Sequence, residues 1–512
     1  MNRAVEGFKE SEYTRARIFS ETLTKRVETP VMDVPTEVRE TDAMLMDQLA
    51  ALTKNLQTAY ENSNKELIAA LEPQVREVKE NRAAFIDTVR AEHPLFAATR
   101  YPQPMSVEKT ALRDDEWVLA YHVTDPGIII YITQGKKLSK AIFKPIAREQ
   151  VDNLVRKYRA PLEMKGGDNI IRKLKQFDFS AGKELSDVLL ADVLPVIPRN
   201  CHIIVIPDDF LGALPFEMLL LNSGGKISTD GEIPYTSGVE FLGDRNPISY
   251  CQSVTALTLA RVYGNQVSPN GKLLILADPV FQTKDPRYAK LEMTTQVEGM
   301  ETSQYGDVMA LMGSDSDSGT GIPRLVLTSD LAENLTRMYG TSVECCTGLQ
   351  ASKEKFLKLA ASGQANYDKI VFATHGYFGK DLPGIREPVL ILNLVPPGTD
   401  GLLRMSEVMS LKMNADIVAL TACQTGLGKK ISGEGTMGMG RAFQYAGAKS
   451  VLMTLWSVAE KSSVMLVENF FRYKKESKSN LEALKLARDD IRKQGFDHPF
   501  FWAPFILVGE AN

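Results

Sequence analysis

Several features that define whole classes of protein are scarce or missing in this sequence of 512 residues. Its five cysteines are odd in number and irregularly spaced, which excludes the disulfide framework of a small secreted domain. The N-terminus has no charged segment followed by an apolar one, so it lacks the pattern of a secretory signal. The longest apolar stretches, such as 127–132 and 500–508, are too short to cross a bilayer. We therefore expect a cytoplasmic protein.

The sequence has no marked excess of charge of either sign. It holds 60 Lys and Arg against 64 Asp and Glu, a formal net charge of −4. This balance gives no electrostatic basis for binding nucleic acid or an anionic membrane, and we expect neither as a direct partner. With 44% apolar and 24% charged residues, the composition is that of a globular protein, and the length predicts two or three domains.

Signals for a metal or a cofactor are also missing. No two histidines have metal-ligand spacing, and Cys345 and Cys346 are adjacent, so no zinc site is indicated. Residues 433–438 match the glycine pattern of a dinucleotide-binding loop. However, the strand expected before them ends in its own reactive Cys423, and no acidic residue ends the next strand. We expect no cofactor and no metal.

Two short segments near the C-terminus each end in a reactive side chain. They are residues 370–376, IVFATHG, and residues 416–423, DIVALTAC. A short apolar run rich in Val and Ile is typical of a buried parallel strand. Because chemistry in open α/β sheets gathers at the carboxyl ends of such strands, we expect His375 and Cys423 to lie together. Either residue alone would be an ordinary core residue, but the pair favours an active site.

This pair has the chemistry of a nucleophile and its base. The Cys423 thiolate can attack a carbonyl, and His375 can activate the thiol or protonate the leaving amine. Gly376 has no side chain, so its N–H can approach the oxyanion of a tetrahedral intermediate, and the N–H of Cys423 can supply a second donor. The candidate catalytic residues are therefore His375 and Cys423, with Gly376 as a candidate oxyanion donor.

The rest of the chain divides into segments that differ in the spacing of their apolar residues. Apolar residues recur at spacings of three and four from Leu49 to Tyr60, which predicts helix in the N-terminal region. Around 116–131 the period changes to two, with a turn signal at 125–127, which predicts a β-hairpin. In the last half, strand patterns alternate with helical ones, as in βαβ units around a mostly parallel sheet. The small, acidic segment 313–319 predicts an exposed, flexible loop.

Taken together, the His-Gly and Ala-Cys segments resemble the caspase-like fold of clan CD cysteine peptidases. They are most similar to the CHAT group, whose domains are often found downstream of TPR repeats. Further stretches fit that group's pattern in the same order: 202–208, 214–217, 274–279, 401–407, 433–443, 446–448, 455–456 and 501–505. The firm resemblance covers about 195–512, and a looser one begins at about 80.

The resemblance implies an α/β fold with a caspase-like, mostly parallel sheet flanked by helices. It also implies three parts. An α-helical N-terminal region at 1–100 would hold helices like those that follow TPR repeats. A degenerate caspase-like half with the β-hairpin would occupy 101–320, and a catalytic half would occupy 321–512. The chain has no repeat of about 34 residues, so we expect no TPR array within it.

The segment 449–460 is also similar, more distantly, to separase, a clan CD enzyme that cuts after Arg. In separase, acidic residues after a Leu-Trp pair help to recognise that basic side chain. Here Glu460 occupies one such position, and Ser457 and Ser462 replace others. Glu460 is therefore a candidate substrate-binding residue. The alternative is a solvent-facing residue at the start of a helix.

The leading interpretation is a cysteine endopeptidase that makes limited, regulated cuts in a protein substrate. The family's use in bacterial defence and regulated cell death implies a latent enzyme, with a gasdermin or another defence effector as a candidate substrate. It also implies an activating protein partner or a TPR-containing module. One alternative is a non-catalytic CHAT scaffold, although a scaffold needs neither His375 nor Cys423. Another is an acyl-transferring hydrolase of a small substrate, which a deep, narrow pocket beside Cys423 would favour.

Overall fold

The computed structural model describes residues 3–12, 15, 35–62, 64–93, 97, 101, 106–164, 169–231, 233–263, 271–288, 322–361, 367–377, 387–396, 398–421 and 433–511. The chain forms two compact units. One consists of residues 6–106, and the other of residues 1–5 together with 107–512. The loop predicted at 313–319 lies outside the described residues, as does Cys423.

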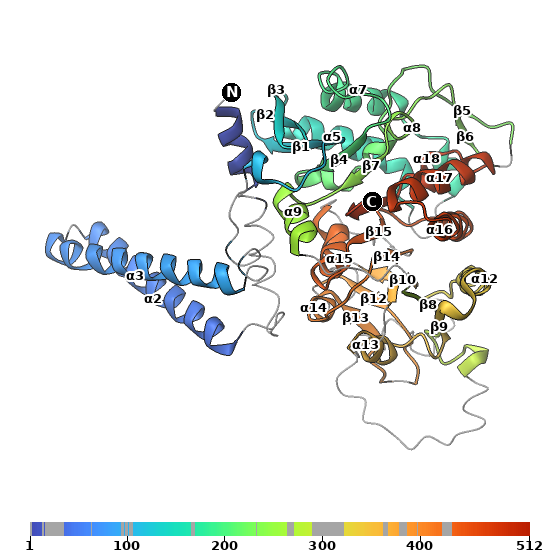
Figure 1. Cartoon of the computed structure of the whole chain (residues 1–512). Coiled ribbons are helices and arrows are strands. Elements are labelled where there is room, and N and C mark those ends of the chain that lie inside the picture. Colours follow the sequence, from blue (N-terminus) through green and yellow to red (C-terminus); the bar gives the residue numbers. More distant parts are fainter. Residues whose placement is uncertain are drawn as a thin grey trace. The chain divides into compact units, whose positions relative to one another are not determined.

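The smaller unit contains two long helices, α2 (Thr36–Glu61) and α3 (Lys65–Glu92), which pack against each other (Figure 1). α3 begins where the Asn64 side chain accepts a hydrogen bond from Leu67 N at 3.1 Å, which satisfies an N–H group of the first turn. Its buried residues between 71 and 78 repeat every three or four positions, as expected for one face of a helix. The predicted helical N-terminal region is confirmed.

The larger unit is built on a sheet whose described part has eleven strands (Figure 1). Their order across the sheet is β3 (Lys137–Lys144), β2 (Gly127–Gln134), β1 (Glu116–Thr124), β4 (His202–Ile206), β7 (Ile248–Tyr250), β16 (Phe505–Gly509), β15 (Ser450–Thr454), β14 (Ile417–Leu420), β10 (Tyr367–Ala373), β8 (Lys272–Pro279) and β9 (Val343–Gly348).

Two blocks of parallel strands make up this sheet. β9, β8, β10, β14 and β15 run in one direction and are called the second block here. β16, β7, β4 and β1 run in the other direction and are called the first block, so β15 and β16 are antiparallel. β1, β2 and β3 add antiparallel hairpins. The carboxyl ends of the two blocks therefore lie at opposite ends of the sheet. The predicted class, α/β with a mostly parallel sheet flanked by helices, is confirmed.

The strand blocks do not change at the boundary that the sequence predicts. β8 precedes residue 320, yet it pairs with β9 and β10 of the second block. Along the chain, the change to the second block therefore comes before Lys272, and β16 belongs to the first block again. As a division into domains, the three parts 1–100, 101–320 and 321–512 stay a prediction.

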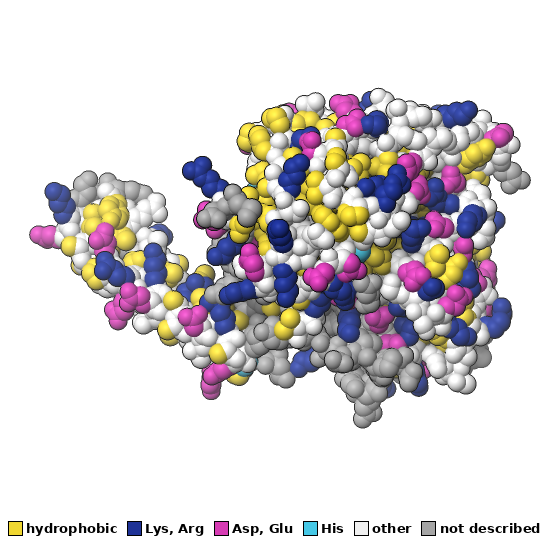
Figure 2. All heavy atoms as spheres, turned by 45° about the horizontal axis from the view of Figure 1, so that its top comes forward, with side chains coloured by type: hydrophobic (Ala, Val, Ile, Leu, Met, Phe, Trp, Pro, Cys, Tyr) yellow, Lys and Arg dark blue, Asp and Glu magenta, His cyan; other side chains and the backbone are white. Residues whose placement is uncertain are grey.

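Helices flank the sheet (Figure 1). α12 (Leu327–Tyr339) contacts β8, β9 and α16 (Glu460–Lys475), while α5 (Arg148–Arg159) packs on α7 (Phe179–Leu190). None of the helices that the structure describes is long and apolar enough to span a membrane. On the face shown in Figure 2, Lys and Arg side chains are interspersed with Asp and Glu, in keeping with the small net charge.

The C-terminal strand β16 joins the two blocks. Val508 is paired with Tyr250 of β7 on one side and with Val451 of β15 on the other. All the residues of β16 are buried. Just beyond it, Glu510 accepts hydrogen bonds from Arg113 Nη1 at 3.0 Å and from Arg261 Nε at 2.6 Å. The seam between the blocks therefore combines an apolar strand with ion pairs at its end.

A second, fully buried polar cluster supports the same seam. Glu217, in the short helix η4 (Phe216–Met218), accepts a hydrogen bond from Tyr250 Oη at 2.5 Å. It also accepts one from Arg488 Nη2 at 2.8 Å, and the Arg488 guanidinium in addition bonds the carbonyl of Phe505. The side chains of Glu217 and Arg488 are 0% and 10% exposed. Each charge is therefore stabilised mainly by the other, because little water can reach either side chain.

This dependence predicts a large effect of Arg488→Ala. Removing one partner leaves the Glu217 carboxylate buried without a cation, so we expect the free energy of unfolding of the larger unit to fall by about 3–5 kcal/mol. A matched control is Arg199→Ala, because Arg199 pairs with Glu240 while the two are 63% and 38% exposed. That control should cost only about 0–1 kcal/mol. Urea unfolding of both variants measures the difference, and equal losses would contradict the prediction.

Candidate active site

His375 lies at the carboxyl end of the second strand block. β10 ends at Ala373, and it pairs in parallel with β14, with Ile370 opposite Val418 and Phe372 opposite Leu420. The two sequence segments with reactive ends are therefore neighbouring strands. β14 leads to Thr421, whose N–H bonds Phe372 O at 3.0 Å. Cys423 comes two residues later and outside the described residues, so its pairing with His375 stays a prediction.

The surroundings of His375 determine which of its ring nitrogens carries the proton. The residue is 5% exposed, and its Nε2 lies 2.8 Å from Pro323 O. Because a carbonyl oxygen can only accept, we assign the proton of the neutral ring to Nε2, which leaves Nδ1 as an acceptor. The ring packs against Phe281 and Tyr377, with centroids 5.4 and 6.4 Å away. A neutral ring with one unprotonated nitrogen can act as the base for a thiol.

Burial also tunes the acidity of this imidazole. Removal from water disfavours the charged ring and lowers the pKa of His375 below its usual value. The hydrogen bond to Pro323 O favours the charged ring and opposes part of this effect. Near neutral pH, His375 is therefore a neutral base that can accept a proton.

Gly376 has a backbone N–H that the neighbouring strand does not use. It belongs to β11 (Gly376–Tyr377), which pairs with β12 (Val389–Ile391). Ile391 N donates to His375 O at 2.8 Å. In an antiparallel ladder, the next pair, Gly376 and Leu390, is then of the kind without mutual hydrogen bonds. The N–H of Gly376 therefore faces away from β12, as an oxyanion donor must. That role stays a prediction.

Glu460 is engaged by another helix. It is the first residue of α16, and its Oε1 accepts a hydrogen bond from Leu327 N, at the start of α12, at 2.5 Å. Burial raises the pKa of Glu460, while the N–H groups of Leu327 and Thr328 oppose the rise. The carboxylate therefore caps α12 instead of only facing solvent. Its part in a substrate pocket stays a prediction.

Sequence reasoning missed a cluster of charged residues beside the Pro323 segment that contacts His375. Asp278 is the last residue but one of β8, at the same end of the sheet, is 3% exposed and adopts a left-handed backbone with φ of 47°. It accepts hydrogen bonds from Arg324 Nε at 2.8 Å and Nη2 at 2.6 Å, and from Arg287 Nη1 at 2.7 Å. The stretch 274–279 supported only the family resemblance, because nothing local links Asp278 to Arg324.

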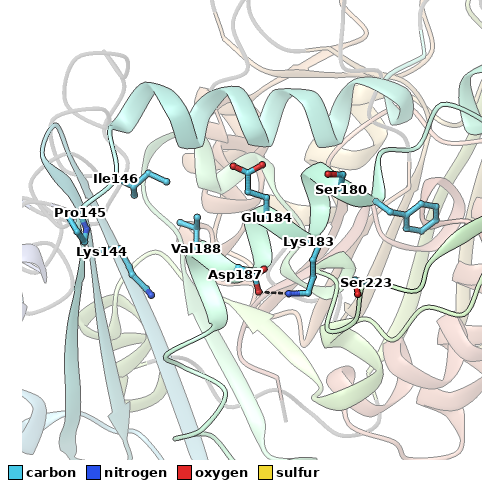
Figure 3. Close-up of a pocket in the computed structure, with 10 residues that line it drawn as sticks. Lys144, Pro145, Ile146, Ser180, Lys183, Glu184, Asp187, Val188 and Ser223 are labelled. Atoms are coloured by element: carbon cyan, nitrogen blue, oxygen red, sulfur yellow. Dashed lines mark hydrogen bonds and ion pairs between the residues drawn. The ribbon is translucent and has the colours of Figure 1, made fainter.

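No group of three or more His, Cys, Asp or Glu side chains that could hold a metal occurs in the described ranges. A cavity of about 720 Å³ lies elsewhere, between the end of β3 and α7 (Figure 3). It is lined by Lys144, Pro145, Ile146, Phe179, Ser180, Lys183, Glu184, Asp187, Val188 and Ser223. None of these is a predicted site residue.

Comparison with known proteins identifies one family. The model of the CHAT domain matches residues 180–510, well over half of the chain. A stretch of 118 residues, 22% of the chain, is 33% identical to tetratricopeptide repeat protein 28 of Mus musculus and 32% identical to that of Homo sapiens. The chain spans only 5% of the length of these relatives.

Solved structures give weaker similarities. The Saccharomyces cerevisiae separase–securin complex is similar over 91% of this chain and 27% of that one, at 12% identity and a TM-score of 0.34. The Porphyromonas gingivalis RgpB complex of pro- and mature domains is similar over 71% and 76%, at 9% identity and a TM-score of 0.33. Scores this low support no further statement about this chain.

The burial of His375 predicts its titration. In a Cys423→Ala background, where no thiolate is present, we expect the ring to titrate below 6.5, because burial penalises its protonated form. NMR of ring signals in histidine-labelled protein measures this, and His375→Gln assigns the resonance among the five histidines. A midpoint at or above 6.5 would show that the ring is not held in the buried position described above.

Proposed function

Because this chain belongs to the CHAT-domain family, we propose that it is a cysteine endopeptidase that makes limited cuts in a protein substrate through His375 and Cys423. The observation that carries this proposal is the hydrogen bond between His375 Nε2 and Pro323 O. It leaves Nδ1 as the acceptor, on a buried ring at the end of the strand next to the one that leads to Cys423.

The proposed reaction begins with transfer of the Cys423 thiol proton to His375 Nδ1. The thiolate then attacks the peptide carbonyl, and the N–H groups of Gly376 and Cys423 stabilise the resulting oxyanion. His375, now positively charged, donates its proton to the departing amine, and a thioester remains on Cys423. Water, deprotonated by His375, hydrolyses that thioester and restores the free thiol. The lowered pKa of His375 keeps the ring neutral before the reaction and makes the imidazolium a stronger acid, which favours proton donation to the departing amine.

The architecture and the context of this activity are part of the proposal. A degenerate half in 101–320 and a catalytic half in 321–512 are proposed from the family resemblance. The opposed strand blocks support this division only in part, because β8 lies in the second block and β16 in the first. A place in bacterial defence or cell death is proposed from the family's use alone, with a gasdermin or similar effector as the substrate. The stretch similar to tetratricopeptide repeat protein 28 supports a TPR-containing module as the activating partner.

Cleavage that depends on Cys423 is the first prediction. Comparing new N-termini in a lysate of the native host, we expect discrete cuts by the native protein and a loss of about 10³-fold or more with Cys423→Ala, because the nucleophile is gone. His375→Ala should lose a similar factor. Cys201→Ala is the matched control, because burial raises the pKa of that thiol to about 11 and keeps it protonated. If cutting survives Cys423→Ala, or never occurs with candidate partners present, the peptidase proposal fails and a scaffold is favoured.

Recognition of a basic residue before the scissile bond depends on the charge of Glu460. Glu460→Gln keeps an oxygen that can accept from Leu327 N but removes the charge. If Glu460 contacts a basic substrate side chain, kcat/KM for Arg-containing peptides should fall by about 10–100-fold, the value of a charged hydrogen bond. Glu468→Gln is the control, because Glu468 lies on the same helix and accepts from Asn334 of α12. If the Glu460→Gln variant keeps the preference for Arg, the substrate contact is rejected and Glu460 serves only to cap α12.

A further inference from the structure

The orientation of His375 depends on a carbonyl that belongs to no strand or helix. Pro323 precedes α12 and is far from His375 in the chain, yet its oxygen lies 2.8 Å from Nε2. The proline ring fixes φ, so the direction of this carbonyl depends on the following peptide plane. That plane also contains the N atom of Arg324. Whatever holds Arg324 therefore holds the hydrogen-bond acceptor of His375.

Contacts on both sides of Pro323 fasten this segment to the exit of β8. Before it, Gln282 Nε2 donates to Ile322 O at 3.0 Å. After it, Arg324 donates through Nε and Nη2 to the two carboxylate oxygens of Asp278, at 2.8 and 2.6 Å. Such a two-point contact fixes the guanidinium in direction as well as in distance. The peptide plane of Pro323 therefore lies between two anchors.

The same anchor reaches the start of α12. Asp278 N donates to Thr328 Oγ1 at 3.1 Å, and Leu327 N donates to Glu460. Asp278 itself is fixed, because it is buried in a left-handed conformation that few residue types tolerate and because Arg287 also bonds its carboxylate. Arg287 is bound in turn by Asp285. A charge-balanced cluster thus holds the residue that directly follows the Pro323 carbonyl.

We propose that Asp278 and Arg324 are positioning residues for His375: their ion pair holds the Pro323 carbonyl against Nε2 and so keeps Nδ1 free of a proton. The catalytic consequence rests on the function proposed above, but the positioning does not. Without the pair, the peptide plane of Pro323 can turn and Nε2 loses its acceptor. The ring then also populates the tautomer with the proton on Nδ1, which cannot accept the thiol proton at that nitrogen.

The decisive measurement reads the tautomer itself. In the full-length protein with Cys423→Ala and labelled histidine nitrogens, ring nitrogen shifts distinguish Nε2–H from Nδ1–H. We expect a single Nε2–H pattern for His375, and its loss to a mixture of both tautomers with Arg324→Gln. Arg324 is 41% exposed, so this change leaves the fold intact, which a melting curve verifies. Asp278→Asn should act alike, because Asn tolerates the same left-handed backbone.

The matched control is Arg156→Gln. Arg156 contacts Asp152 through the same two atoms, Nε at 2.9 Å and Nη2 at 2.8 Å, on helix α5. It should leave the His375 signals unchanged. If Arg324→Gln and Asp278→Asn both keep the wild-type pattern, the positioning proposal is wrong, whatever the protein cleaves.

A kinetic readout separates this proposal from the peptidase proposal. Once a cleaved peptide is known, Arg324→Gln in the protein with Cys423 restored should lower kcat by about 10–100-fold with a smaller change in KM, as for other groups that orient a catalytic side chain. A changed tautomer with no Cys423-dependent cleavage would support positioning and reject the peptidase. Cys423-dependent cleavage with an unchanged tautomer would support the peptidase and reject the positioning proposal.

Discussion

The pairing of β16 with β7 on one side and β15 on the other makes one sheet out of two strand blocks. Because β16 is parallel to the first and antiparallel to the second, the blocks run in opposite directions. The carboxyl ends that favour ligand binding are thereby separated, and His375 and Asp278 share one end of the sheet. The strand is apolar and buried. Arg488 donates to the carbonyl of its first residue, Phe505, and Arg113 and Arg261 donate to Glu510 just beyond its end. Most of the larger unit is arranged around this seam.

At the end of the second block, a backbone carbonyl takes the place that an acidic side chain often has beside a catalytic histidine. A carboxylate would favour the charged ring and raise its pKa, whereas the uncharged Pro323 carbonyl offsets only part of the effect of burial. The ring therefore stays neutral, with its proton directed to Nε2. The charged residues instead hold the segment that carries the carbonyl. Arg324, which directly follows Pro323, donates to Asp278, and Arg287 donates to the same carboxylate.

The carboxylates around this end of the sheet serve first as anchors. Asp278 holds two arginines, and Glu460 holds the first N–H groups of α12. For Glu460, the sequence suggested either a substrate contact or a solvent-facing helix start, and the structure adds a third role that local sequence cannot reveal. A residue can combine such a cap with a substrate contact, since a carboxylate has two oxygens and accepts several hydrogen bonds.

The sequence by itself determined the parts that depend on neighbouring residues. Short apolar runs specified β10 and β14 and the place of His375 at a strand end, and the helical spacing specified α2. Because side-chain periodicity is local, it survives in the sequence alone. Only the tertiary structure decided that Pro323 faces His375, that Asp278 holds Arg324, and that the last strand is inserted between β7 and β15. These contacts join residues far apart in the chain, and their geometry depends on how the whole sheet is assembled. The pairing of His375 with Cys423 rests on sequence and family alone.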